Sequence, residues 1–216
     1  HGGDAMRYTL VQLATGSQDV RLGVDFICPY SGIIFTPSYV KSLTGHEVMA
    51  PIQSSPEDEV KKISTLYGLL IGEVENCEET PLAVNSSSRF DVGRNFATKY
   101  WNANRFALMN VSKPAEHVSI DELTSVDQWM LSRVDSSILK LNDALSKYQF
   151  SAASEAMYDL LWRDFCDWYL EAIKPTIKES PAQQRVLHTV LDAICRMLHP
   201  ICPFVTEAIW PHVHSI

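Results

Sequence analysis

Apolar side chains recur every three to four positions through most of the chain, which is the spacing of the buried face of an amphipathic α-helix. Phe96 and Tyr100 show this spacing in one stretch, and Val190 and Ile194 show it in another. The pattern predicts helices at residues 4–14, 89–111, 124–145, 151–174, 181–198 and from about 204 onward. Long helices joined by short links favour a mainly α fold, an up-and-down helical bundle.

Several predicted helices carry signals for their first or last residue. Thr124 can cap one helix while Asp127, three residues on, faces the exposed N–H groups. Ser180 and Pro181 begin another helix, because proline suits a first position whose N–H needs no partner. Pro175 ends the helix between them, because proline cannot continue the hydrogen-bond ladder.

Residues 22–88 differ from the rest, with short β-branched or aromatic runs between prolines and glycines. Ile33–Phe35 is one such run and is typical of a strand. One helix is predicted inside the segment, with Ser55 as its N-cap and Pro56 at its first position. We therefore expect a junction helix at residues 1–21, a small α+β insert at residues 22–88 and the helical bundle at residues 89–216.

The charge of the chain is distributed unevenly. Its 216 residues carry a formal net charge of −8, and residues 22–88, with nine acidic and three basic side chains, account for −6 of it. A uniformly basic surface for nucleic acid is therefore excluded. Residues 89–105 nevertheless hold four basic side chains against one acidic, interleaved with asparagines and aromatic rings. Cations, amides and rings are the groups that contact unpaired RNA bases.

The cysteines and the chain ends bear on compartment and completeness. Five scattered cysteines indicate reduced thiols in a cytosolic protein. Cys166 is interpreted as a small core hydrophobe, since nothing near it in the sequence supplies a base. No apolar stretch approaches the roughly 18 residues of a membrane span. The chain begins at His1 and stops at Ile216, just after a helix begins, so we interpret it as a piece of a longer protein.

Several stretches resemble signatures of the valyl-tRNA synthetase family. Gly93–Phe106 resembles GRNFxxKxWNAxRF, and Phe165–Pro175 resembles FCDWYLExxKP. Four further stretches are similar to GADALRFTL, GQDI, DxWILS and LHPxxPFxTE, in that order: Gly3–Leu10, Gly16–Val20, Asp127–Ser132 and Met197–Glu207. Isoleucyl- and leucyl-tRNA synthetases share this outline, but the asparagine-rich segment after Arg94 favours the valyl family.

The resemblance implies that the bundle recognises a tRNA anticodon through the helix at residues 89–111. It implies that Lys99 contacts anticodon bases or phosphate, that Asn102 contacts a base edge and that Phe106 stacks on a base. Arg94 and Arg105 are either phosphate clamps or structural ion-pair partners. Four further aromatic residues are expected in the core: Trp129, Trp162, Trp168 and Tyr169.

Residues 22–88 are the main departure from the family, which has a much shorter link at this place. Phe26–Gly32 is similar to the first knuckle of a zinc ribbon, but Ser31 replaces the second thiolate. A tetrahedral zinc site needs four ligands, and only Cys28, His46 and Cys77 are conceivable. We expect a degenerate, metal-free ribbon and therefore no metal site.

The resemblance implies a cytoplasmic parent enzyme that attaches valine to its tRNA with ATP and magnesium. The HIGH and KMSKS signatures that hold ATP are absent from this sequence, so we assign it no catalytic residue and no cofactor of its own. Expected partners are the anticodon loop of tRNA(Val) and the catalytic and editing domains of the parent chain, with no membrane. Two alternatives stay open: a helical scaffold for protein partners, and the equivalent domain of an isoleucyl- or leucyl-tRNA synthetase.

Overall fold

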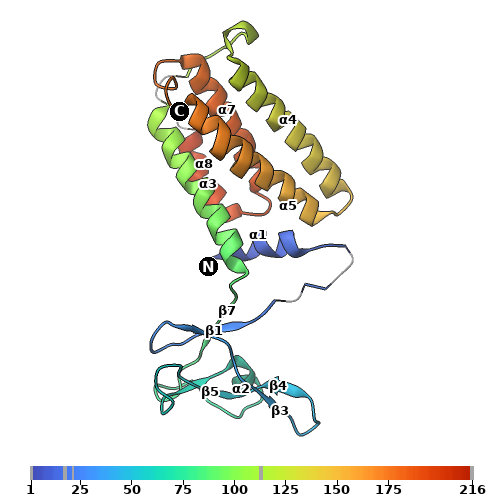
Figure 1. Cartoon of the computed structure of the whole chain (residues 1–216), viewed down its shortest axis with the longest axis vertical. Coiled ribbons are helices and arrows are strands. Elements are labelled where there is room, and N and C mark those ends of the chain that lie inside the picture. Colours follow the sequence, from blue (N-terminus) through green and yellow to red (C-terminus); the bar gives the residue numbers. More distant parts are fainter. Residues whose placement is uncertain (1, 17–18, 21, 112–113, 215–216) are drawn as a thin grey trace. The chain divides into compact units, whose positions relative to one another are not determined.

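The computed structural model describes residues 2–16, 19–20, 22–111 and 114–214. Ser17 and Gln18 of the GQDI-like stretch, Arg21 at the predicted junction boundary and the terminal residues His1 and Ile216 lie outside the described residues. The chain divides into two compact units (Figure 1): a helical unit of His1–Val20 with Phe90–Ile216, and a smaller unit of Arg21–Arg89.

The helical unit confirms the predicted mainly α fold, and Figure 1 shows its long helices running side by side. Its elements are α1 (Gly3–Leu13), α3 (Phe90–Asn110), the 3₁₀ turn η1 (Ile120–Glu122), α4 (Ser125–Ser146), α5 (Phe150–Tyr158), the π-helix η2 (Asp159–Tyr169), α6 (Leu170–Ile173), α7 (Pro181–Leu198) and α8 (Pro203–Val213). The predicted helical stretches begin and end within about one residue of these bounds. Among the described residues, no helix has the length and apolar character needed to cross a bilayer.

One buried carboxylate both caps α4 and ties it to η2. Thr124 Oγ1 accepts a hydrogen bond from the N–H of Asp127 at 3.2 Å, and the Asp127 carboxylate accepts one from the N–H of Thr124 at 3.1 Å. This reciprocal pair confirms the predicted cap. The buried hydroxyl of Tyr169 donates to the same carboxylate at 2.8 Å. The start of α4 is therefore fixed to the end of η2.

The first helix of the chain is held within the helical unit by polar contacts to α8. The carboxylate of Asp4 accepts hydrogen bonds from the N–H groups of Phe204 at 3.2 Å and Val205 at 2.6 Å. These N–H groups have no partner within the helix, and the N-terminus of a helix favours an anion. Arg7 donates two hydrogen bonds of 2.9 Å to carbonyl oxygens just before α8. The two charged side chains dock α1 against that helix start.

Close packing of α1 against α3 explains the glycine of the GRNF-like motif. A Cβ atom at Gly93 would lie 2.2 Å from the carbonyl oxygen of Ala5. Next to this contact, the rings of Tyr8 and Phe96 stack with their centroids 4.0 Å apart, and both are buried. The absence of a side chain at Gly93 therefore lets α1 and α3 approach closely enough for the two rings to stack.

The π-helix is the main local departure from the predicted bundle. Residues 159–169 lie within the stretch predicted as α-helix, and they contain no glycine or proline that would indicate a change. The i→i+5 hydrogen bonds of a π-helix place residues five apart near the same face. In an α-helix such residues lie about 140° apart around the axis. Trp162 and Asp167 therefore lie near the same face of η2, whereas in an α-helix they would lie on different faces.

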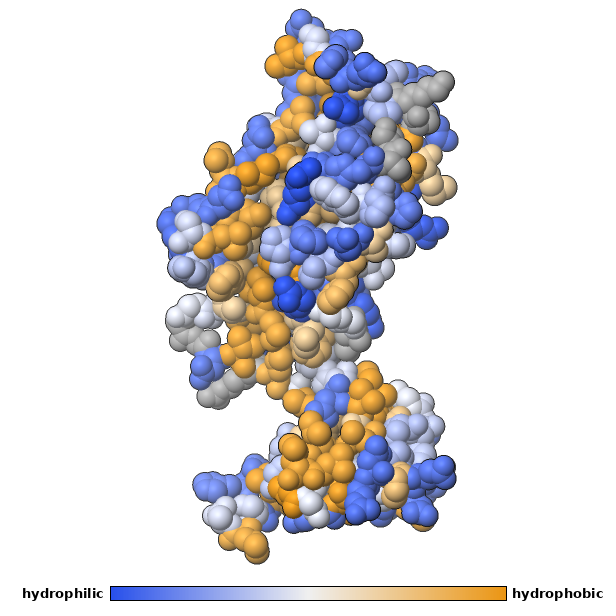
Figure 2. Space-filling view, turned by 180° about the vertical axis from the view of Figure 1, so that it is seen from behind, coloured by the Kyte–Doolittle hydropathy of each residue, from blue (hydrophilic) through white to orange (hydrophobic). Residues whose placement is uncertain are grey.

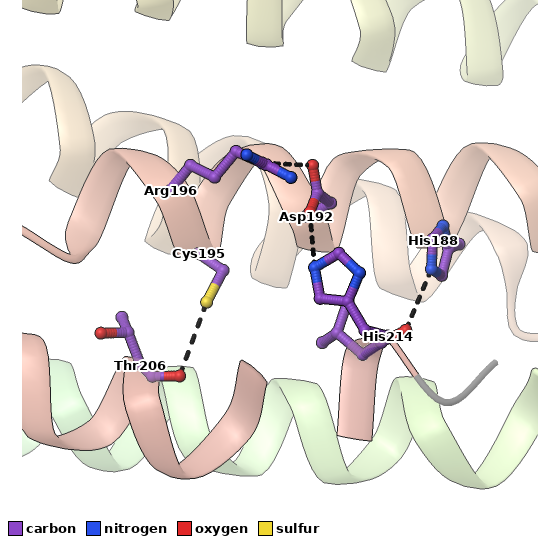
Figure 3. Close-up of polar contacts among 7 residues, drawn as sticks. His188, Asp192, Cys195, Arg196, Thr206 and His214 are labelled. Carbon is purple, nitrogen blue, oxygen red and sulfur yellow. Dashed lines mark hydrogen bonds and ion pairs between the residues drawn. The ribbon is translucent and has the colours of Figure 1, made fainter. Parts of the chain in front are cut away.

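Polar side chains join α7 to α8 (Figure 3). The carboxylate of Asp192 lies 2.7 Å from Nε of Arg196 on the same helix and 3.2 Å from Nε2 of His214 just after α8. One turn earlier on α7, Nε2 of His188 lies 3.0 Å from the carbonyl oxygen of Val213. These contacts fix the end of α8 to the middle of α7.

The smaller unit contains three small antiparallel sheets with orders β2–β1–β7, β3–β4 and β5–β6. Its strands are β1 (Asp25–Ile27), β2 (Ile34–Phe35), β3 (Tyr39–Lys41), β4 (Glu47–Met49), β5 (Ile52–Ser54), β6 (Lys62–Ser64) and β7 (Val84–Ser86). The buried core is small: Phe26, Cys28, Ile63 and Ala83. Figure 2 shows many hydrophobic side chains left at the surface of this unit.

The helix predicted from Ser55 onward is wrong. This stretch forms the turn between β5 and β6, where the N–H of Ser55 donates to the carbonyl oxygen of Lys61 at 2.9 Å. The Asp58 side chain accepts a hydrogen bond from the N–H of Val60, two residues on. Serine, aspartate and proline favour turns as well as helix starts, so the same residues fit both structures. The helix among the described residues of this unit is α2 (Leu66–Leu70), capped by Thr65.

Two of the three conceivable zinc ligands of the smaller unit contact protein hydroxyl groups. Cys28 is buried, with Sγ 3.5 Å from Oγ of Ser55. Cys77 is exposed, with Sγ 3.2 Å from Oγ1 of Thr80. Within the described ranges, no three side chains of His, Cys, Asp or Glu gather into a candidate metal site. The metal-free ribbon stays a prediction, which elemental analysis of the protein would test.

Candidate nucleic-acid interface

The five residues predicted to contact RNA all lie on α3, but the structure places them in different surroundings. Lys99 contacts Trp162 of η2, and Phe106 is contacted by Lys174, the residue directly after α6. They are seven residues apart, which is two helical turns and about 10 Å along the axis. The other three, Arg94, Asn102 and Arg105, lie on the more exposed side of the same helix.

The ammonium group of Lys99 is engaged by η2. Its Nζ lies 3.0 Å from Oδ1 of Asp167 and 5.0 Å from the centroid of the Trp162 ring. The hydrogen bond to Asp167 raises the pKa of Lys99, so the side chain stays protonated at neutral pH. One third of the side chain, 34 %, is exposed to solvent. Lys99 is therefore a charged group at the surface whose charge is already balanced.

Phe106 is half-buried and packs against the bundle core. Nζ of Lys174, directly after α6, lies 5.6 Å from the centroid of its ring. Lys174 is in turn paired with the carboxylate of Glu171. The ring therefore contributes to packing, and it also carries an ammonium group over one face, at the distance of a cation–π contact.

The other three predicted residues lie outside the cluster that Lys99 and Phe106 form with Trp162 and Lys174 and with the paired carboxylates. Arg94 pairs with Asp91 at 3.1 Å, three residues earlier on α3, which is the ion-pair alternative left open for it. Asn102 is exposed. Arg105 is also exposed and lines, with Trp101, a groove of about 290 Å³ between α3 and α8. Their roles as RNA contacts stay predictions.

Two of the four aromatic residues predicted in the core are at the surface instead. Trp168 is 69 % exposed and Trp129 is 38 % exposed, whereas Tyr169 is buried as predicted and Trp162 is partly buried. Trp129 lies one residue before Met130, the first buried apolar residue of α4.

Trp168 owes its exposure to the π-helix. At α-helical spacing it falls on the same stripe as the buried Leu161 and Phe165. The wider turn of a π-helix changes that register and carries Trp168 off the stripe. Trp129 of α4 and Trp168 of η2 line a mostly apolar hollow of about 250 Å³, which Ala172 of α6 also lines.

Cys166 is buried, as predicted for a core residue. Burial raises the pKa of its thiol to about 12, although the nearby Lys99 opposes this effect. A thiol with that pKa is almost entirely protonated at neutral pH, and the protonated thiol is a poor nucleophile. The structure therefore supports the structural interpretation of this cysteine.

Three charged side chains of the FCDWYLExxKP-like stretch belong to the cluster although the sequence did not indicate them: Asp167, Glu171 and Lys174. At α-helical spacing Trp162 and Asp167 fall on different faces, so a helical pattern separates the two groups that meet at Lys99. The identity of the stretch was visible in the sequence, but its π-helical register was not.

The helical unit matches a known family along most of its length. Residues 127–215 match the family described as "Anticodon-binding domain of tRNA ligase". This match covers α4 to α8, and α3 precedes it. Recognised relatives extend the similarity to the rest of the chain.

The valine–tRNA ligase of Rhodopirellula baltica is 36 % identical over 100 % of this chain and 20 % of its own length. The valine–tRNA ligase of Thermotoga maritima is 46 % identical over 56 % of this chain and 14 % of its own length. The valine–tRNA ligase of Mycolicibacterium paratuberculosis is 44 % identical over 54 % of this chain and 13 % of its own length. The chain thus spans a fifth or less of the length of these relatives. Residues 127–215 form an anticodon-binding domain of a tRNA ligase, and the chain as a whole is a relative of the valine–tRNA ligases.

Proposed function

We propose that this chain binds the anticodon loop of tRNA(Val), with α3 and the adjoining η2 and α6 as the contact surface. The observation that carries the proposal is the cluster of Lys99 and Phe106 with Trp162 and Lys174 on neighbouring elements. It presents two cations and two aromatic rings at a partly exposed surface. Cations hold the RNA backbone and rings stack on unpaired bases, which is the chemistry of a single-stranded loop.

Each predicted residue then has a defined role. Phe106 stacks on a base, Lys99 binds a phosphate or a base acceptor about two helical turns away, and Asn102 between them offers an amide to a base edge. Arg105 contributes a cation to the flanking backbone. In a longer protein of the kind that the relatives represent, this domain serves a cytoplasmic ligase that attaches valine to tRNA with ATP and magnesium.

The test is a binding titration of the full chain with a tRNA(Val) transcript and with the same transcript carrying a changed anticodon, each at several salt concentrations. We expect tighter binding of the unchanged transcript and an affinity that falls as salt rises, because bound cations release counterions from the phosphates. Equal affinity for both transcripts would contradict the proposal. Tighter binding of an isoleucine or leucine anticodon would assign the domain to one of those enzymes instead.

Lys99→Ala provides the residue-level test. We expect weaker binding and, if Lys99 contacts a phosphate, a salt dependence reduced by about 0.7 in the slope of log K against log salt. Lys140→Ala is the matched control, since Lys140 is an exposed lysine on α4. If both variants weaken binding equally, the contribution of Lys99 is only its share of the overall charge.

A further inference from the structure

Two lysines and two aromatic rings alternate along the line where α3 meets η2 and α6. Lys99 of α3 lies over Trp162 of η2, and Lys174 after α6 lies over Phe106 of α3. α3 therefore contributes one cation and one ring, and the η2–α6 segment with the residue after it contributes the other cation and the other ring. The ammonium nitrogens lie 5.0 and 5.6 Å from the ring centroids, and the two contacts are two turns apart along α3.

Each of the two lysines also has a carboxylate partner. Asp167 pairs with Lys99 at 3.0 Å, and Glu171 pairs with Lys174. Because two positive and two negative groups are combined here, the surface predicted to be cationic is close to neutral in the free protein. A phosphate that approaches either ammonium group therefore meets a carboxylate already in place.

These carboxylates are accessible enough to be exchanged. The side chain of Asp167 is 45 % exposed and that of Glu171 is 59 % exposed. Exposed ion pairs are weak, because water screens them and both side chains lose freedom. Arg133 and Asp164 provide a contrast: this pair also joins two elements, at 2.7 Å, but its carboxylate is only 15 % exposed. The pairs at Lys99 and Lys174 are the ones that a competing anion can open.

We propose that Asp167 and Glu171 are internal competitors of the RNA, whose carboxylates occupy Lys99 and Lys174 in the free protein and are displaced by RNA phosphates on binding. Lys174 is then a further RNA contact. Its ammonium group moves away from the face of the Phe106 ring, and a base stacks on that face instead. This inference rests on the proposed function, since it describes how the same surface is kept from binding anions when no tRNA is present.

Removing the competitors should strengthen binding. We expect Asp167→Asn and Glu171→Gln each to raise the affinity of the full chain for the tRNA(Val) transcript by about two- to fivefold, the factor that an exposed ion pair represents. Asp143→Asn is the matched control, because it removes the same charge and releases Lys147 from an exposed pair on α4. A gain in the control equal to that of the two variants would overturn the proposal, since net charge alone would then explain it.

A double-mutant cycle separates competition from a positioning role. If Asp167 competes with RNA, Lys99→Ala costs more affinity in the Asp167→Asn background than in the original chain. If Asp167 instead holds Lys99 in place for RNA, Asp167→Asn weakens binding and the proposal is wrong. Far-UV circular dichroism of each variant verifies that the helices are intact.

The failure of this proposal is distinguishable from that of the proposed function. Anticodon-dependent binding that Asp167→Asn and Glu171→Gln leave unchanged or weaken overturns the competition and leaves the function standing. Binding by the original chain that ignores the anticodon overturns the function itself. Lys174→Ala adds a last check, with weaker binding expected, while Lys178→Ala, an exposed lysine four residues on, should leave affinity unchanged.

Discussion

The helical unit and the smaller unit hold their folds in different ways. The helical unit buries a continuous apolar core that includes the rings of Tyr8, Phe96 and Phe165. The core cluster of the smaller unit contains four buried hydrophobic residues, and polar contacts such as that of Thr65 with the carbonyl oxygen of Pro51, at 2.9 Å, complete it. Burial of apolar area is the main source of stability in folded proteins. The two units should therefore respond differently to the loss of one large ring.

The largest expected effect is on the stability of the helical unit. Phe96→Ala removes a fully buried ring that stacks on Tyr8, and we expect it to lower the free energy of unfolding by about 3–5 kcal/mol. Urea unfolding followed by far-UV circular dichroism, which reports the helices, measures this loss. Phe26→Ala removes the main ring of the smaller core and should leave the helical transition almost unchanged. If Phe26→Ala shifts that transition as far as Phe96→Ala does, the two units unfold together.

The second prediction concerns the one ring that both packs and is proposed to bind. Phe106→Leu keeps most of the apolar volume but removes the aromatic face, so we expect a loss of about 1–3 kcal/mol in tRNA binding, roughly tenfold, with little change in Tm. Leu145→Ala is the control, because Leu145 is also partly buried against the core but lies on α4.

The two outcomes separate cleanly. Leu145→Ala should lower Tm and leave the affinity for tRNA(Val) unchanged. A drop in Tm for Phe106→Leu with unchanged affinity would make Phe106 structural, and the assignment of α3 as the reading helix would lose its stacking residue.

The contrast between the units also shows what a sequence can reveal. In the helical unit, periodic apolar positions and the caps at Thr124 and Ser180 predicted each helix, because a long helix repeats its signal over several turns. In the smaller unit, the helix signal at Ser55 was wrong, because a short stretch can satisfy the same polar side chains in a turn.

The candidate site was predictable only in part, for a similar reason. Lys99 and Phe106 were predicted as RNA contacts from the family resemblance, and they lie on α3, which has ordinary α-helical spacing. Asp167 and Trp162 meet at Lys99 only because η2 is a π-helix. Nothing local in residues 159–169 indicates that register, so the balance of charge at the site could not be read before the fold was known.

The third prediction compares the two units through their thiols. Cys77 of the smaller unit is exposed, while the other four cysteines are buried. Burial raises the pKa of Cys166 and of Cys202 to about 12, so thiolate is scarce at neutral pH and increases as pH rises towards that value. We expect one thiol per chain to react rapidly with a thiol reagent in the native protein, and none in Cys77→Ser. A second fast thiol would show that a buried cysteine opens readily to solvent.

The smallest expected effect is that of a metal chelator, which should leave the smaller unit unchanged. A structural zinc ion normally needs four ligands, and such domains unfold when it is removed. Here Ser31 stands where a second thiolate would be expected, Cys28 is buried beside Ser55, and Cys77 contacts Thr80. We therefore expect well under one zinc per chain by elemental analysis and the same unfolding midpoint with and without chelator. Stoichiometric zinc that disappears in Cys28→Ser but persists in Cys195→Ser, a buried cysteine of the helical unit, would contradict this and make the smaller unit a working zinc ribbon. In that case metal coordination would supply the stability that its four-residue core lacks, and the contrast between the two units would be one between a metal site and an apolar core.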